Sequence, residues 1–156
     1  SIQAKLTWGF ALVAILAVFN SAGRVVGGFL SDRIGRNRTL ILMFLLQAAN
    51  MLLFKNYADM TSLTIGVCIT GIAYGALLGI FPALTYDYFG LKNSGTNYGL
   101  VFTAFGAAGV IGPLMAGKIV DITGSYSYAY LAAAIILAAA AVMAKFLNKP
   151  AREAMA

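Results

Sequence analysis

Five long apolar segments constrain this sequence more than any other feature. They cover about residues 6–30, 39–54, 63–82, 98–118 and 128–145. A hydrocarbon core about 30 Å thick takes roughly 20 residues of helix to cross, and in lipid only helices and closed barrels satisfy their backbone hydrogen bonds. None of the segments alternates as a barrel strand does. We therefore predict an all-α membrane protein with five transmembrane helices. The second segment is short, at 16 residues, so we allow its helix to begin inside the preceding loop.

The composition supports a membrane protein and excludes several other classes. Of the 156 residues, 61% are hydrophobic and 10% are charged, which is more apolar than a soluble domain of this size requires. The net charge of +6 is spread in ones and twos instead of forming a basic face, so we expect no nucleic-acid partner. There is no histidine, and the single cysteine, Cys68, lies within an apolar segment. We therefore expect Cys68 to serve packing, and we expect no metal or other cofactor.

The basic residues assign the loops to the two sides of the membrane. Seven lie on one side and three on the other, the seven being Arg33, Arg36, Arg38, Lys92, Lys145, Lys149 and Arg152. Cytoplasmic loops carry the excess of lysine and arginine. We therefore predict a multi-pass protein of the plasma or bacterial inner membrane, with residues 149–156 as a cytoplasmic tail. Ser1 would then lie outside, so we also expect at least one further helix before it.

Arg24 is an isolated charge inside the first apolar segment. Eighteen uncharged residues separate it from Lys5, and seven separate it from Asp32. At 1.5 Å per residue, Arg24 lies roughly 12 Å above Asp32, near the middle of the membrane. A central arginine costs about 2.5 to 3.5 kcal/mol on insertion scales, so such a residue usually faces a cavity or a partner. Arg24 is therefore a candidate functional residue.

The third segment carries a stripe of small residues. Gly71, Gly75 and Gly79 recur at four-residue spacing and therefore share one helix face. Small residues let a neighbouring helix backbone approach closely. We predict a tightly packed helix interface along this stripe.

The loop after the first segment, Gly28 to Arg38, carries a motif. It reads Gly-Phe-Leu-Ser-Asp-Arg-Ile-Gly-Arg-Asn-Arg. This closely resembles the G-x-x-x-D-R/K-x-G-R/K signature of the major facilitator superfamily. In this interpretation Gly28 admits the neighbouring helix, Asp32 caps a helix or pairs with an arginine, and Gly35 permits the tight turn.

Other runs resemble one branch of that superfamily. Residues 81–90, 97–103, 109–113 and 121–126 look like the last part of the oxalate/formate antiporters, bacterial relatives of the monocarboxylate transporters. The resemblance implies a twelve-helix fold in which residues 1–148 are a partial C-terminal bundle, helices eight to twelve. The N-terminal half of the same transporter is then the expected partner, together with membrane lipid.

The resemblance also implies a carboxylate site. An arginine of the eighth helix binds the substrate carboxylate in this family, and Arg24 matches it. Its planar guanidinium can meet a carboxylate with two parallel hydrogen bonds. Asn20 lies one turn earlier on the same face, where animal monocarboxylate transporters carry an aspartate that takes part in proton coupling. Two roles of Asn20 stay open: contact with the substrate, and a hydrogen bond that packs one helix against another.

A second essential cation of the oxalate/formate antiporters, a lysine of the eleventh helix, is replaced here by Phe105. With one buried cation left, a dianion would keep an unneutralised charge, so a monocarboxylate such as lactate, pyruvate or formate fits better. Tyr74 is expected to bond the substrate or close the pocket, with a bond to another helix as the alternative.

The family implies transport by alternating access, with Asp32, Arg33 and Arg36 as a latch on the cytoplasmic side. The coupling partner stays open between a proton and a counter-transported anion. Two alternatives stand beside monocarboxylate transport: an oxalate/formate-type dicarboxylate antiporter, and a sensor with the same fold that does not transport. An enzyme is not expected, because the acidic residues lie near loops and form no pair inside the membrane.

Overall fold

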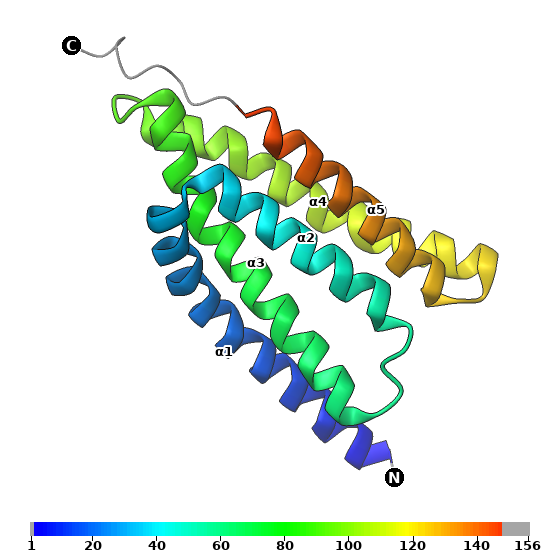
Figure 1. Ribbon diagram of the computed structural model, residues 1–156. Coiled ribbons are helices and arrows are strands. Elements are labelled where there is room, and N and C mark those ends of the chain that lie inside the picture. Colours follow the sequence, from blue (N-terminus) through cyan, green and yellow to red (C-terminus); the bar gives the residue numbers. More distant parts are fainter. Residues whose placement is uncertain (1, 148–156) are drawn as a thin grey trace.

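The computed structural model describes residues 2–147, and their side chains from Trp8 onward. Five helices follow one another up and down through the molecule (Figure 1). They are α1 Ile2–Ile34, α2 Arg36–Phe54, α3 Met60–Phe89, α4 Ser94–Thr123 and α5 Tyr126–Lys145. Each contains a span long and apolar enough to cross a membrane. The predicted all-α, five-helix membrane architecture is confirmed.

The helices extend beyond the apolar segments. Glycine and polar residues mark where they begin and end. α2 begins at Arg36, directly after Gly35, whose φ of 93° lies in the left-handed region that favours glycine. Asp59 caps α3 by accepting a hydrogen bond from the Ser62 backbone N–H at 3.0 Å. This backbone bond, together with one from the Ser62 hydroxyl, lowers the pKa of Asp59. Gly35 therefore forms the turn between α1 and α2, and the Asp59 cap ends the turn between α2 and α3.

α1 and α3 pack backbone to backbone along the predicted glycine stripe. A Cβ added at Gly75 would overlap the backbone of Asn20, and one added at Gly79 would lie 3.0 Å from the Arg24 carbonyl oxygen. Gly71 likewise faces the backbone of α1. The α3 stripe therefore packs against the segment of α1 that carries Asn20 and Arg24.

α1 contributes two glycines of its own to this interface. A Cβ at Gly23 would overlap Ile72, and one at Gly27 would overlap Ala76. The expected close approach at Gly28 is not found within the described residues, where nothing lies within 4 Å of an added Cβ. Successive residues of a helix point about 100° apart, so Gly27 and not Gly28 faces α3.

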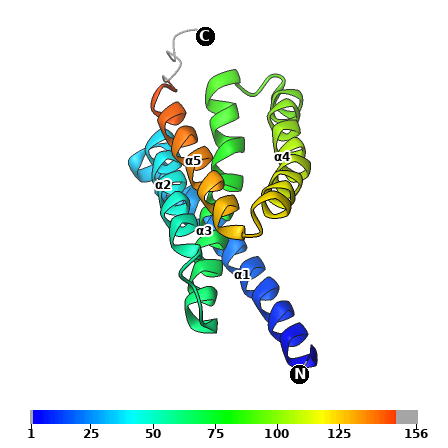
Figure 2. The ribbon, with the colours of Figure 1, turned by 90° about the vertical axis from the view of Figure 1, so that its right-hand side faces the viewer.

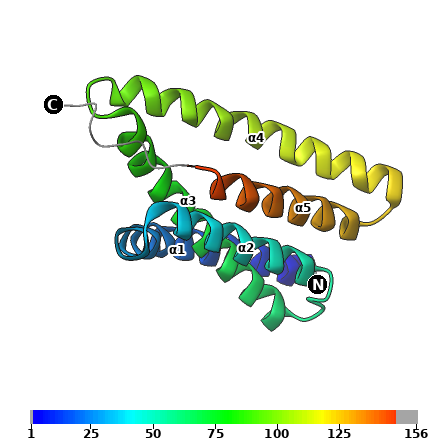
Figure 3. The same cartoon turned by 45° about the horizontal axis from the view of Figure 1, so that its top comes forward.

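α5 packs mainly on α2, and α4 stands at the edge of the bundle. α5 lies between α2 and α4 (Figure 3), and α4 stands away from α1 in the orthogonal view (Figure 2). α4, described along its whole length, has no buried residue. The core joins α2, α3 and α5 through Leu40, Met43, Ala76, Ile80, Leu84 and Ala144. Most large apolar side chains outside this core are exposed, as expected for helices that contact lipid or further helices.

A polar network fastens α2 to α3 on the side away from the α1 interface. The Asn50 side chain is buried and donates to the Gly66 carbonyl and the Thr70 hydroxyl, both at 3.0 Å. Its own carbonyl oxygen accepts from the Tyr57 hydroxyl at 3.1 Å. Interhelical hydrogen bonds of this kind contribute about 0.6 kcal/mol each on average in membranes. The network therefore adds modest stability and fixes the register of the two helices.

Candidate functional site

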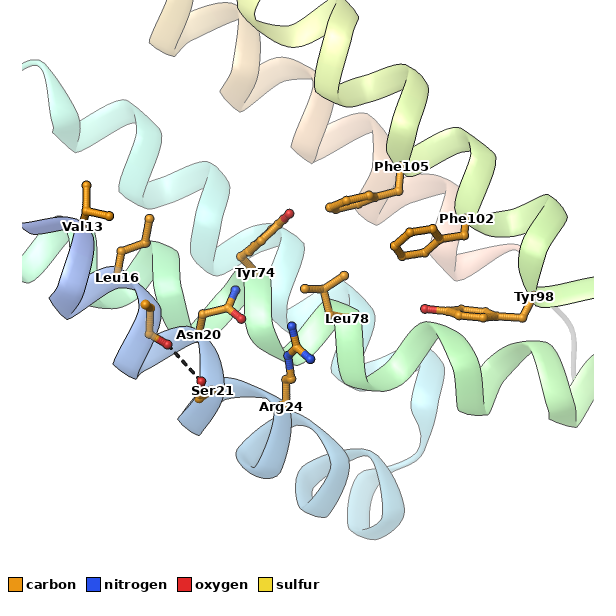
Figure 4. Close-up of a pocket in the computed structure, with 11 residues that line it drawn as sticks. Val13, Leu16, Asn20, Ser21, Arg24, Tyr74, Leu78, Tyr98, Phe102 and Phe105 are labelled. Atoms are coloured by element: carbon orange, nitrogen blue, oxygen red, sulfur yellow. Dashed lines mark hydrogen bonds between the residues drawn. The ribbon is translucent and has the colours of Figure 1, made fainter. Parts of the chain in front are cut away.

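A cavity of about 740 Å³ lies between α1, α3 and α4 (Figure 4). It is lined by Val13, Leu16, Ala17, Asn20, Ser21, Arg24, Tyr74, Leu78, Tyr98, Phe102 and Phe105. Its volume falls within the range of about 300–1,000 Å³ that is usual for small-molecule sites. All four residues predicted to contact substrate are in the lining. The structure thus brings together residues that are up to 85 positions apart, from Asn20 to Phe105.

Arg24 supplies the charge of this cavity. Its guanidinium points into the cavity from α1 (Figure 4), and among the described residues it is the only charged one of the lining. Within the part of the chain that the structure describes, no carboxylate pairs with it and no acceptor takes a hydrogen bond from it. The donors of the guanidinium are therefore available to a ligand, and the ligand they favour is an anion.

Asn20 lies beside Arg24 on the same wall. Its amide points into the cavity (Figure 4), while its backbone is held against Gly75 of α3. The neighbouring Ser21 hydroxyl donates to the Ala17 carbonyl at 3.1 Å. Ser21 therefore has its donor occupied, which leaves the Asn20 amide and the Arg24 guanidinium as the polar groups that α1 presents to a ligand.

Tyr74 and Phe105 meet across the cavity from α3 and α4. Their ring centroids are 5.9 Å apart and the planes are inclined by 29°. Among the described residues, the Tyr74 hydroxyl makes no hydrogen bond with another helix, so the bond expected as an alternative is not found there. Phe105 thus contributes an apolar ring to the cavity lining.

Two further aromatic residues of the lining, Tyr98 and Phe102, were not predicted from sequence. Phe102 stacks on Phe105 with centroids 5.0 Å apart, and Tyr98 lies 5.6 Å from Phe102. Residues 98, 102 and 105 share one face of α4, since they are spaced by one and two helical turns. This spacing can be recognised in the sequence. The helix that this face would meet cannot be recognised there.

The loop predicted as a latch forms an ion-pair cluster at one end of the bundle. The Arg36 side chain pairs with Asp32, at 3.6 Å, and donates to the Asp87 carboxylate near the end of α3. Arg33 makes no ion pair within the described residues and instead lies over the Phe29 ring, 4.3 Å from its centroid. Asp87 was missed as a partner because the two residues are 51 positions apart and nothing local relates them.

The same loop also contacts the end of α5. The Asn37 amide donates a hydrogen bond to the Leu147 carbonyl, just beyond α5. Through Arg36 and Asn37, the first turn of α2 therefore contacts the ends of both α3 and α5. The tail predicted to be cytoplasmic, residues 149–156, lies outside the described residues.

A sequence profile of the Major Facilitator Superfamily matches residues 3–155. The chain belongs to this superfamily. The prediction made from the Gly28–Arg38 motif is confirmed, and the five helices are part of a twelve-helix fold. Among described residues, no group of three or more histidine, cysteine or acidic side chains could hold a metal ion.

Relatives of known and unknown activity are similar to this chain. An oxalate:formate antiporter of Oxalobacter formigenes is 30% identical over 86% of the chain and 32% of its own length. Human monocarboxylate transporter 2 is 32% identical over 54% of the chain and 18% of its own length. An uncharacterized MFS-type transporter of Escherichia coli, YhjX, is 30% identical over 63% of the chain and 25% of its own length. The matched part of the chain therefore spans a third or less of the length of each of these three relatives.

Proposed function

We propose that the full-length protein carries small monocarboxylate anions, such as lactate, pyruvate or formate, across a cell membrane by alternating access. The observation that carries this proposal is the Arg24 guanidinium, which points into a cavity with its donors unused by the described residues. Arginine binds a carboxylate with two parallel charge-assisted hydrogen bonds. Asn20, one turn away, adds a neutral amide that can donate to the same anion.

The charge of the lining favours a monoanion over a dianion. Arg24 alone carries charge there, and Phe105 contributes an apolar ring. A second carboxylate would lie against aromatic surface without a described counter-charge, which costs free energy in a low dielectric. Dicarboxylate exchange is the second candidate, because a relative named oxalate:formate antiporter is similar over most of the chain.

Alternating access requires parts that move against one another. The N-terminal half of the same transporter would close the cavity from its other side. The Arg36–Asp87 and Arg36–Asp32 pairs would then hold the cytoplasmic side in its closed arrangement. A proton or a counter-transported anion would couple the movement to an ion gradient, and the C-terminus would face the cytoplasm.

Uptake of labelled substrates by the full-length protein in proteoliposomes tests the proposal. Wild type and Arg24→Lys are compared with lactate, pyruvate, formate and oxalate as substrates. Lysine keeps the charge but lacks the planar fork, so we expect roughly tenfold or greater loss of uptake at low substrate concentration. Full transport by Arg24→Lys would exclude the assigned role of the guanidinium. Preferential uptake of oxalate would favour the second candidate, and no uptake of any anion would favour a sensor that does not transport.

A further inference from the structure

One wall of the cavity is aromatic and faces the anion-binding wall. Tyr98, Phe102 and Phe105 follow one face of α4, and Tyr74 of α3 extends the same stack. Arg24 and Asn20 point into the cavity from α1, while the α4 rings point toward it from the opposite side (Figure 4). The cavity is therefore divided into a polar wall and an aromatic wall.

The rings of this aromatic wall are open to the cavity. Phe102 is 45% exposed, Tyr74 43% and Phe105 40%, although each stacks on another ring. Stacking joins them into one continuous surface and leaves their remaining area uncovered by the described residues. Apolar surface of this kind is favourable to cover, and aromatic rings prefer flat partners in stacked or edge-on contact.

The volume and charge of the cavity limit which molecules can contact both the polar wall and the aromatic wall. An anion of one to three carbon atoms held at Arg24 is small beside a cavity of about 740 Å³, and it would leave the aromatic wall hydrated. An amino acid would bring an ammonium group, yet the described part of the chain places no acidic side chain in the lining. A molecule with one carboxylate and a flat apolar body satisfies both walls.

We propose that the aromatic wall, Tyr74, Tyr98, Phe102 and Phe105, binds the body of the substrate and selects aryl-bearing monocarboxylates over the smallest ones. This inference rests on the proposed function, because it takes Arg24 as the carboxylate site. Arg24 and Asn20 hold the carboxylate at one end. The aryl group then stacks on Phe105 and Phe102 at the other end. Phe105 is in this view a specificity-determining residue.

Competition against labelled pyruvate in proteoliposomes containing the full-length protein tests the inference. Pyruvate and phenylpyruvate form a matched pair that differs by one phenyl group. In wild type we expect phenylpyruvate to inhibit at a concentration roughly tenfold or more below that of unlabelled pyruvate. In Phe105→Leu and Phe102→Leu we expect this ratio to fall severalfold. Phe10→Leu is the matched control, since Phe10 is 74% exposed and is not in the cavity lining.

The outcomes separate this inference from the proposed function. Equal inhibition by the two anions in wild type would overturn the aromatic wall while leaving monocarboxylate transport intact. An unchanged ratio in both phenylalanine variants would overturn it as well. Failure of wild type to transport or bind either anion would instead refute the proposed function. The ratio of inhibitory concentrations in wild type is measured without any variant. In the variants, measurable pyruvate uptake shows that the protein has folded.

Discussion

Asn20 and Arg24 give the polar wall of the cavity its particular charge. They lie one turn apart on α1, and both side chains point into the same cavity. Because Asn20 is neutral, the arginine has no described counter-ion. The positive charge is therefore left for a ligand, and the nature of residue 20 decides whether it stays available.

Asn20→Asp is expected to make uptake dependent on pH. The introduced carboxylate would pair with Arg24 and compete with the substrate, so uptake near pH 7.5 should fall about tenfold. Pairing with Arg24 favours the ionised carboxylate, so acid should relieve the competition, and the ratio of variant to wild-type uptake should rise, only as the pH falls below about 4. Labelled pyruvate uptake across this pH range measures the ratio. Asn56→Asp, in the loop before α3, is the control, and a ratio for Asn20→Asp that does not vary with pH would contradict the prediction.

Arg36 is the residue on which the proposed latch depends, because it contacts both Asp32 and Asp87. Exposed ion pairs of this kind contribute about 0–1 kcal/mol. Asp87→Asn should therefore lower the maximal rate of uptake modestly, by roughly two- to fivefold, with little change in the half-saturation concentration. Asp87→Glu should restore the rate and Asp121→Asn should not alter it. A half-saturation effect without a rate effect would argue against a latch.

At the scale of elements, the α1–α3 interface is the most specific contact of the bundle. Glycines on both helices allow the backbones to touch, and the touching segment of α1 bears Asn20 and Arg24. The stripe on α3 could be predicted from its four-residue spacing. The matching glycines of α1 could not be chosen in advance, because the sequence does not say whether Gly27 or its neighbour Gly28 faces the partner helix.

Gly75→Ala should disrupt both packing and uptake. The new methyl group would overlap the Asn20 backbone, so α1 must shift away from α3. We expect a loss of stability of roughly 1–3 kcal/mol, as for other overpacked sites, and a clear loss of pyruvate uptake. The unfolding temperature of the purified full-length protein measures the first effect. At Gly117, where nothing described lies within 4 Å, alanine should be neutral or slightly stabilising. Equal effects at the two sites would show that the contact is not specific.

At the scale of the whole molecule, the distribution of charge predicts which end of the bundle faces the cytoplasm. The α1–α2 loop, the α3–α4 loop and the end of α5 lie at the same end and carry most of the basic residues. In a Cys68→Ala background, Lys92→Cys should react with a membrane-impermeant maleimide only in inverted vesicles. Asn56→Cys should react only in intact cells. The reverse pattern would invert the proposed topology.

How far the sequence predicts this molecule depends on the range of each interaction. The five helices follow from local composition, and the superfamily follows from the Gly28–Arg38 motif. Arg24, Asn20, Tyr74 and Phe105 could be named as candidates because a charge at mid-depth and the family resemblance pointed to them. The Arg36–Asp87 pair and the stack of Phe102 on Phe105 beside Tyr74 depend on which helices meet, and that is settled by packing along the whole chain.

The separate packing of α4 has a consequence for how such a site can diversify. The proposed anion-binding groups stand on α1, which is fixed to α3 by backbone contact, whereas most of the aromatic wall stands on a helix with no buried residue among those described. Substitutions at positions 98, 102 and 105 can therefore change which ligand shapes fit the cavity without disturbing the core. Under the proposed function, a lineage that inherits this arrangement would acquire new substrates by mutating α4 alone and would retain its preference for a carboxylate.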